Sequence, residues 1–195
     1  MKVISSSGYS ADLAASPLTA GQEITGRRAD SSNVVLMTKQ IEQIVELTIK
    51  AVPEVFQVML SMDLNTEDPA SIPLDPSGQI IGSVGFAGDA TGVIYLYSGL
   101  MFAKVITSRM LGIEMAEVEG DQMVNDAFGE LSNMVVGHVK SRLCDAGLPC
   151  TLTIPSIVRG QGLRIEGASQ VERRMIGFRN SEHRLLAEVL VKKAS

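Results

Sequence analysis

The sequence predicts an α+β domain in which a mostly antiparallel sheet packs against long helices. Two stretches, residues 33–52 and 121–147, carry apolar side chains at the spacing of a buried helix face. Elsewhere the apolar period changes to two, in short runs bounded by Gly, Asn or Pro, as in strands. Because these strands follow one another closely, neighbours are expected to pair, which favours this class over a Rossmann-type fold.

The first helix is expected to begin near Asn33 and to bury the stripe between Ile41 and Val52. Pro53 is expected to stop or kink this helix, because proline lacks the N–H that the helix interior needs. A further turn or two then follows over residues 54–62. Prolines at three positions predict a loop or irregular edge structure over residues 63–79.

The remaining elements are predicted from the spacing of apolar residues along the chain and from the positions of turn-forming residues. They are a β-hairpin with strands at 80–86 and 93–98, a helix at 100–111, the helix at 121–147, a strand at 151–158 and a closing hairpin at 170–178 and 183–193. Gly88–Gly92 lacks the lysine and the full glycine pattern of a phosphate loop, so it is interpreted as the hairpin turn. Pro155 inside a strand indicates an edge position or a bulge.

The domain organisation is simple. Residues 1–32 are rich in Ser, Ala and Gly and have no sustained apolar period, which predicts a flexible N-terminal tail. Residues 33–195 are then a single domain, since 195 residues suit one substantial domain better than two.

Composition excludes several classes of function. A net charge of −5 argues against broad binding of nucleic acid or acidic lipid. Cys144 and Cys150, with His138 and His183, are too few and wrongly spaced for a disulfide scaffold or a zinc site. No signal-peptide run and no stretch of about 18 apolar residues is present, so we expect a cytoplasmic protein without a membrane span.

The helix at 121–147 carries a line of polar or small residues opposite its apolar face. At about 100° per residue, Asp126, Glu130, Asn133, Gly137 and Lys140 fall within an arc of about 80°. By itself such a line indicates only a solvated face.

Gly129 and Gly137 flank this line, and small residues beside a carboxylate and an amide would let another surface come close. His138 lies near the edge of the apolar arc. With no Ser or Cys nucleophile placed to work with it, a packed or hydrogen-bonded histidine is favoured over a catalytic one.

The order of features adds to this reading. The hairpin GFAGDATGVIYLYS, the following helix, the pattern Asp126-xxx-Glu130-Leu-x-Asn133 and the segment Pro155-Ser-Ile-Val-Arg-Gly160 occur in one succession. Together they resemble the CheX-like branch of the CheC/CheX/FliY chemotaxis phosphatases, over about residues 34–193.

The resemblance has two departures. The interval from Asn133 to Pro155 is about one residue shorter than the family spacing, a difference that a loop absorbs, and the tail has no counterpart. Two-site relatives repeat Glu-xx-Asn on their first helix. Here Glu42 and Glu46 are followed three residues later by Val45 and Ile49, so one site per chain is expected.

The resemblance implies a CheX/CheC-like fold and hydrolysis of the aspartyl phosphate on a CheY-type response regulator. Asn133 would orient the attacking water and Glu130 would engage a lysine of the regulator. Asp126 would tune docking, with Gly129, Gly137 and Lys140 on the same docking surface. Mg²⁺ would be held by the regulator, so this chain would bind no cofactor. Homodimers through sheet edges are also implied.

Two other functions stay open at this point. One is a non-catalytic CheX-like adaptor that uses the same helix to bind a response regulator or a flagellar-switch component. The other is a small-molecule sensor, which would need a large apolar cavity between helix and sheet.

Overall fold

A seven-stranded antiparallel sheet and three α-helices make up the part of the chain that the computed structural model describes, residues 31–72, 78–163, 165–166 and 170–192. The elements in chain order are α1 (Ser31–Leu60), β1 (Asn65–Glu67), the 3₁₀ turn η1 (Pro69–Ser71), β2 (Gln79–Gly88), β3 (Gly92–Gly99), α2 (Leu100–Leu111), the 3₁₀ turn η2 (Met115–Glu117), α3 (Gly120–Asp145), β4 (Cys150–Leu152), β5 (Ser156–Gly160), β6 (Val171–Arg179) and β7 (Arg184–Lys192). The predicted α+β class is confirmed.

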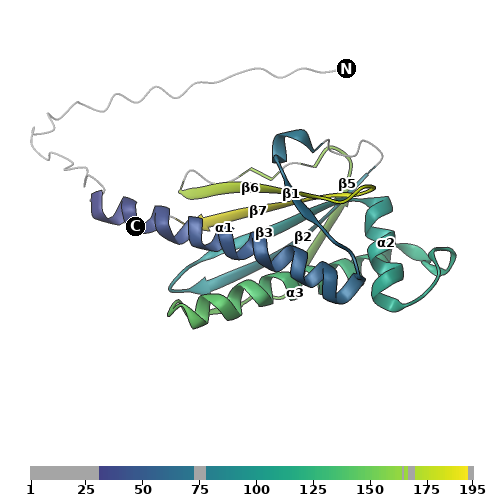
Figure 1. Ribbon diagram of the computed structural model, residues 1–195, viewed down its shortest axis with the longest axis horizontal. Helices are drawn as coiled ribbons and strands as arrows, with labels where there is room; N and C mark the ends of the chain where they lie inside the picture. The colour runs from purple at the N-terminus through teal and green to yellow at the C-terminus, as the bar shows by residue number, and fades with distance from the viewer. Residues whose placement is uncertain (1–30, 73–77, 164, 167–169, 193–195) are drawn as a thin grey trace, which may run out of the picture.

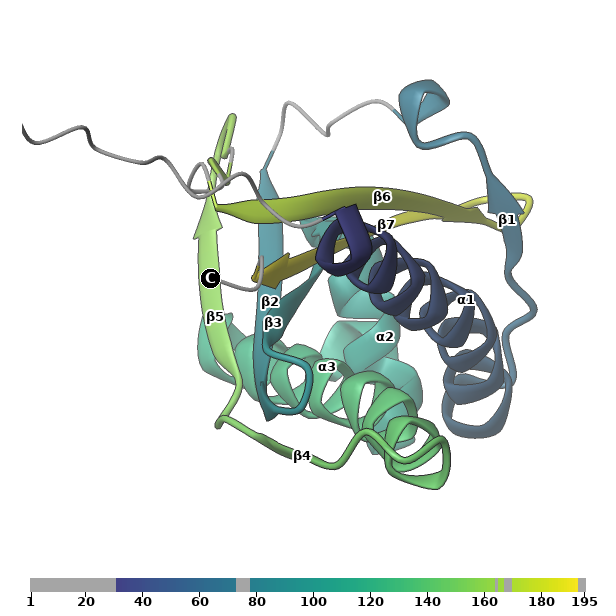
Figure 2. The ribbon, with the colours of Figure 1, turned by 90° about the vertical axis from the view of Figure 1, so that its left-hand side faces the viewer.

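The sheet has the strand order β1-β6-β7-β3-β2, and β4 and β5 both pair with the outer edge of β2. Its two hairpins are the predicted ones, β2–β3 and β6–β7. In the view along the helices, the sheet curves around α1 and α3, with β6 and β7 across the top and β2 and β5 at the side (Figure 2). This curvature leaves one long side of α3 facing away from the sheet.

The main core lies between the helices and the concave face of the sheet. Ile94 and Leu96 of β3 point into it, as their alternation with Tyr95 and Tyr97 predicts. Phe56 of α1 and Phe102 of α2 meet there, with ring centroids 6.1 Å apart. The helices therefore cover one face of the sheet and are held by apolar contact.

Helix α1 continues through Pro53 to Leu60, so a stop at Pro53 is wrong. The residues after Pro53 still bury Val55 and Phe56, and this packing outweighs the hydrogen bond that proline removes. The helix begins at Ser31, two residues before the expected start. The rest of the expected tail lies outside the described residues.

Two segments at the edges of the sheet differ from the prediction: one expected loop contains a strand, and one expected strand is split in two. Asn65–Glu67 forms the short strand β1, which pairs with β6 inside the expected loop. The expected strand at 151–158 is split at Pro155 into β4 and β5, both on the edge of β2. The edge position predicted from Pro155 is confirmed, because proline has no N–H for a ladder.

The outer face of β7 is buried as well, which the simple alternation does not predict. Glu188 is fully buried there. Its carboxylate accepts a hydrogen bond from the Tyr97 hydroxyl and forms an ion pair with Arg173. Burial, followed by the hydrogen bond to Glu188, raises the pKa of Tyr97. This network satisfies a charge on a face that otherwise buries Ile81 and Leu186.

Candidate active site

Helix α3 lies close against β2 because Gly82 has no side chain. A Cβ at Gly82 would lie 2.2 Å from Ser132 Oγ and 3.2 Å from Phe128 Cδ1. Phe128, Leu131 and Val135 are fully buried on this side of the helix. The contact therefore fixes both the height and the rotation of α3 above the sheet.

That rotation turns the predicted polar line outward. Glu130 and Asp126 are exposed, and Asn133 is half-buried. Residues three apart on an α-helix are separated by a rise of about 4.5 Å, and their side chains point about 60° apart around the helix axis. Glu130 and Asn133 therefore lie side by side. Among the described residues, neither side chain has a hydrogen-bond or ion-pair partner. Both are therefore available to a second molecule.

The flanking residues differ in their surroundings. Asp126 Oδ1 accepts a hydrogen bond of 2.7 Å from Gln122 Nε2. A Cβ at Gly137 would meet nothing within 4 Å, so a surface can approach the helix there. Lys140 is half-buried one turn further on. These three residues share the open face with Glu130.

Gly129 does not lie on that open face, contrary to its predicted place in the docking surface. It is buried, and a Cβ there would lie 3.7 Å from Ile157 and 4.0 Å from Pro155. These are ordinary contact distances, so the β4–β5 segment of the same chain, rather than a partner, packs beside α3 at Gly129. Pro155 and Ile157 therefore form a wall beside α3 at Gly129, one turn before Asn133.

Arg159 of β5 ties this wall to the start of α3. Its Nη1 lies 2.7 Å from Asp121 Oδ1 and donates to the Asp121 carbonyl oxygen at 3.3 Å. The same nitrogen lies 3.5 Å from Asn125 Oδ1. This role was not predicted, because the sequence does not show that β5 runs along α3. The only signal is an arginine close behind Pro155 in an edge strand.

His138 lies on a different surface of α3, where the helix meets α1. Its Nδ1 is 3.9 Å from Glu54 Oε2, and the same carboxylate pairs with Arg142. A packed or hydrogen-bonded histidine was expected; its side chain is 49% exposed, so it is not packed, and its polar neighbour is the Glu54 carboxylate. The described residues place no Ser or Cys within hydrogen-bond distance of it, which agrees with a non-catalytic role.

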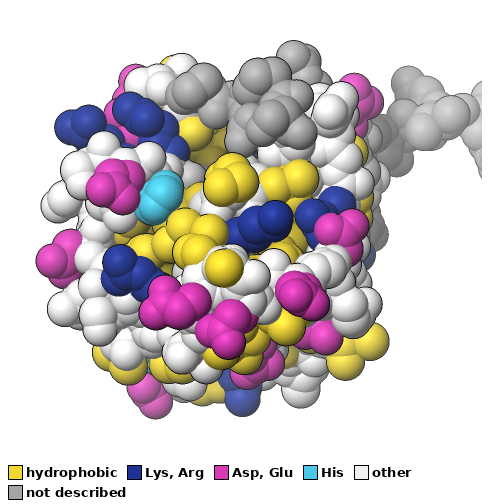
Figure 3. Space-filling view, turned by 90° about the vertical axis from the view of Figure 1, so that its right-hand side faces the viewer, with side chains coloured by type: hydrophobic (Ala, Val, Ile, Leu, Met, Phe, Trp, Pro, Cys, Tyr) yellow, Lys and Arg dark blue, Asp and Glu magenta, His cyan; other side chains and the backbone are white. Residues whose placement is uncertain are grey.

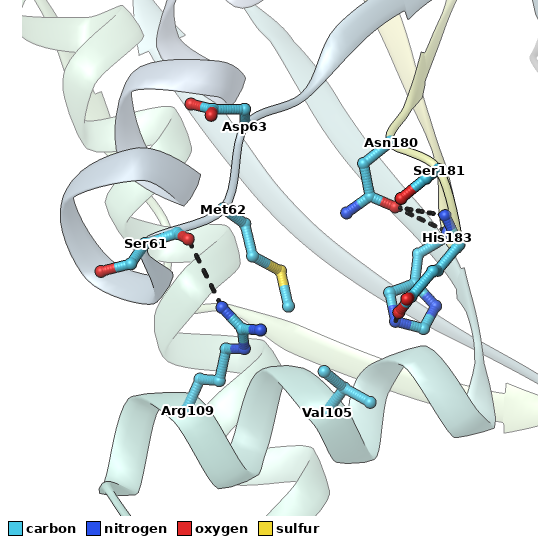
Figure 4. Close-up of a pocket in the computed structure, with 9 residues that line it drawn as sticks. Ser61, Met62, Asp63, Val105, Arg109, Asn180, Ser181 and His183 are labelled. Atoms are coloured by element: carbon cyan, nitrogen blue, oxygen red, sulfur yellow. Dashed lines mark hydrogen bonds and ion pairs between the residues drawn. The ribbon is translucent and has the colours of Figure 1, made fainter.

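A surface cavity of about 480 Å³ lies between the end of α1, α2 and the β6–β7 turn (Figure 4). Arg109 projects into it and donates to the carbonyl oxygens of Leu60 and Ser61, at 2.8 and 3.4 Å, so it caps α1. His183 stacks on Phe102, with centroids 4.3 Å apart. This cavity is open and polar, unlike the apolar cavity between helix and sheet that a sensor would need.

Neither a metal site nor a membrane span is found in the described part of the chain. The described residues contain no cluster of three or more His, Cys, Asp or Glu side chains arranged to hold a metal ion. Within the same ranges, no helix has the length and apolar character needed to span a membrane. Cys144 and Cys150 are both free thiols.

The family model "Chemotaxis phosphatase CheX" matches residues 80–179. The chain belongs to the CheX family. The matched region contains β2 from its second residue onward, β3, α2 and all of α3, and so includes Glu130, Asn133 and Pro155. The resemblance seen in the sequence is thereby confirmed.

Individual CheX proteins extend this finding. The chain is 28% identical over 126 residues to the CheY-P phosphatase CheX of Thermotoga maritima, covering 64% of this chain and 80% of that protein. It has the fold of CheX from Vibrio vulnificus (24% identity, TM-score 0.65, 76% of this chain and 96% of that one). It also has the fold of a chain in the CheX–CheY–BeF₃–Mg²⁺ complex of Borrelia burgdorferi (19% identity, TM-score 0.63, 76% and 97%).

Proposed function

We propose that this chain is a phosphatase that accelerates hydrolysis of the aspartyl phosphate on a CheY-type response regulator, in chemotaxis or related two-component signalling. The observation that carries the proposal is the pair Glu130 and Asn133. These side chains lie adjacent on the open face of α3, without partners among the described residues, inside the region that matches the CheX family. The related protein of Thermotoga maritima is a CheY-P phosphatase.

The chemistry suits a helper with few reactive groups. An aspartyl phosphate is already an activated acyl phosphate, so placing a water in line with phosphorus and stabilising charge is sufficient. The Asn133 carbonyl oxygen accepts a hydrogen bond from that water, and its amino group donates elsewhere. Asn133 is half-buried, which restricts its rotamers and so the direction in which it presents the amide.

Glu130 has a binding role in this proposal. Its exposed carboxylate pairs with a lysine beside the phosphorylated aspartate of the regulator and anchors α3 over that site. On closing, the pair loses water and its attraction strengthens. Mg²⁺ belongs to the regulator, held by its own carboxylates, and supplies charge neutralisation to the phosphoryl group there.

The proposal extends to assembly and compartment. The outer edge of β5, Ser156–Gly160, has no strand partner among the described residues, so a second copy can pair with it to form a homodimer. The substrate is an intracellular signalling protein, so the phosphatase acts in the cytoplasm. Sedimentation at several concentrations tests the dimer, and a monomer throughout would contradict it.

The test of function is phosphate release. A CheY-type regulator from the same organism is phosphorylated with a small phosphodonor, the donor is removed, and the loss of phosphate is followed with and without this protein. We expect acceleration by the wild type. Binding of the regulator without faster loss of phosphate would select the non-catalytic adaptor instead.

A further inference from the structure

Helix α3 begins at one end of the molecule with little of its own to hold the first turn. Its N-cap residue, Glu119, makes no side-chain capping hydrogen bond, and Glu119, Gly120 and Asp121 are exposed. Figure 3 shows this end, where acidic side chains lie in a row below an apolar area that also contains Lys and Arg side chains. A helix start without a side-chain cap is held less firmly than a capped one. The first turns of α3 therefore depend on other elements for their position.

Arg159 of β5 makes such a contact. Its Nη1 lies 2.7 Å from Asp121 Oδ1 and 3.5 Å from Asn125 Oδ1, so one guanidinium reaches two successive turns of the helix. The side chain of Arg159 is only 19% exposed, whereas that of Asp121 is 83% exposed. The arginine is therefore the fixed partner, and the start of α3 is held to it.

This contact is better suited to fixing position than to adding stability. An ion pair with an exposed carboxylate contributes little to the free energy of unfolding, because water competes for both groups. A positive charge beside the first turn also opposes the helix macrodipole, which favours negative charge there. Neither effect weakens the geometric restraint. The guanidinium of Arg159 therefore supplies mainly a defined distance between β5 and α3.

Residues four apart on α3 form a row that connects this contact to the candidate site. The row consists of Asp121, Asn125, Gly129 and Asn133. Its first two members contact Arg159, and its third packs beside Ile157, which projects from the same face of β5 as Arg159. Successive members are displaced by about 40° around the helix axis. This rotation brings Asn133, the fourth member, from the β5 side toward the open face.

We propose that Arg159 is a positioning residue for the phosphatase: by holding the first turns of α3 on β5, it sets the direction in which Asn133 presents its amide. This inference rests on the proposed function, in which Asn133 places the attacking water, and Arg159 acts through the helix. In-line attack by that water tolerates little displacement. Glu130 is less sensitive, because its exposed carboxylate ends a flexible side chain that follows a small shift of the backbone.

The positioning role has a defined kinetic signature. Loss of Arg159 should let the start of α3 shift, which misplaces the water but still allows Glu130 to pair with the regulator. The maximal rate of phosphate loss should therefore fall, while the protein concentration that gives half of this rate changes little. A merely structural role would instead reduce the amount of folded protein without changing the rate per folded molecule.

The test is single-turnover loss of phosphate from a phosphorylated CheY-type regulator of the same organism, over a range of concentrations of the full chain in excess. Arg159→Ala should lower the maximal rate about 10-fold, since a misplacement of about 1 Å can cost as much as about 100-fold. The half-saturating concentration should stay within about 3-fold of the wild-type value. Arg159→Lys keeps a charge beside Asp121 but loses the planar fork of donors, so it should recover part of the rate.

Arg174→Ala is the matched control. Arg174 of β6 also ties a strand to a helix, through ion pairs of 3.1 Å to Glu42 of α1 and 3.2 Å to Glu172 of its own strand. Because it holds α1 and not α3, its loss should leave the maximal rate within about 2-fold of wild type. Thermal unfolding shows whether both variants are folded at the assay temperature. Equal losses of maximal rate in Arg159→Ala and Arg174→Ala would overturn the proposal.

Asp121→Ala is a second variant, at an exposed residue whose replacement puts folding at little risk. It removes the ion pair but keeps the contact between Arg159 and Asn125, so it should slow phosphate loss less than Arg159→Ala does. Because both variants act on the start of α3, adding Asp121→Ala to Arg159→Ala should cause little further loss. Fully additive losses in the double variant would contradict an action of Arg159 through the helix.

A spectroscopic measurement separates this inference from the function on which it rests. The side-chain amide resonances of Asn133, identified by their absence from Asn133→Ala, should shift in Arg159→Ala and stay in place in Arg174→Ala. Unshifted resonances in Arg159→Ala would refute the positioning role, as would a wild-type maximal rate in that variant. A wild type without phosphatase activity would refute the proposed function, and the resonances would still decide whether Arg159 positions Asn133.

Discussion

Substituting Gly82 by alanine should displace α3, because the helix rests on this glycine of β2. The added Cβ would lie 2.2 Å from Ser132 Oγ and 3.1 Å from Ser132 Cβ. Rotating the hydroxyl relieves the first contact but not the second, so backbone must move. Overpacking of this kind costs about 1–3 kcal/mol of unfolding free energy. For a chain of 195 residues, about 2 kcal/mol lowers Tm by roughly 4–8 °C.

A double-mutant cycle measures the origin of this loss. Ser132→Ala removes the hydroxyl and its 2.7 Å hydrogen bond to the Phe128 carbonyl oxygen, which should cost less than about 1 kcal/mol. Adding Gly82→Ala to Ser132→Ala should then cost about 1 kcal/mol less than in the wild type, because the closest contact is gone. Urea denaturation of the four proteins gives the free energies. Strictly additive effects, or a Gly82→Ala protein as stable as wild type, would refute the contact as the cause.

Three further predictions concern the site and its surroundings. Gly137→Ala should raise the unfolding free energy by about 0.5–1 kcal/mol, since the new methyl meets nothing within 4 Å, yet weaken binding of the regulator in a titration. Unchanged affinity would remove Gly137 from the docking surface. Glu130→Ala should weaken that affinity more than it slows phosphate loss at saturation, and an unaltered dissociation constant would count against its binding role. Burial and, less strongly, Arg109 lower the pKa of His183, so the unfolded state binds more protons below about pH 6.5 and stability should fall as pH drops. His183→Phe keeps the stacking on Phe102 and should flatten this pH dependence in thermal unfolding, and an unflattened profile would assign the effect elsewhere.

The sequence predicted the elements that have a strong period of their own. The stripe of α3 and the alternation in β3 depend on which residues face the core, and both were found as expected. The polar line on α3 was also predicted, because an exposed helix face opposite a wide apolar face follows from the 3.6-residue repeat. Its reading as a phosphatase site depended on the family resemblance.

What the sequence did not predict depends on contacts between distant segments. Gly129 was placed on the open face, since nothing local indicates that Pro155 and Ile157 pack against it. The continuation of α1 past Pro53 depends on burial of Phe56 in the core, which outweighs the local preference. Arg159 clamps α3 only because β5 pairs with β2 in the register that puts it there. Each of these three features depends on contacts that exist only once the sheet and helices have assembled.

The most direct test of the central claim is a single-turnover measurement of phosphate loss from the phosphorylated regulator, with this protein in saturating excess. The account predicts that wild type accelerates the loss and that Asn133→Ala binds the regulator with similar affinity yet loses most of the acceleration, about 100-fold or more for a residue that positions the attacking water. Ser141→Ala, on an exposed residue two turns along α3, is the control and should match wild type. An Asn133→Ala protein that dephosphorylates the regulator as fast as wild type would contradict the account.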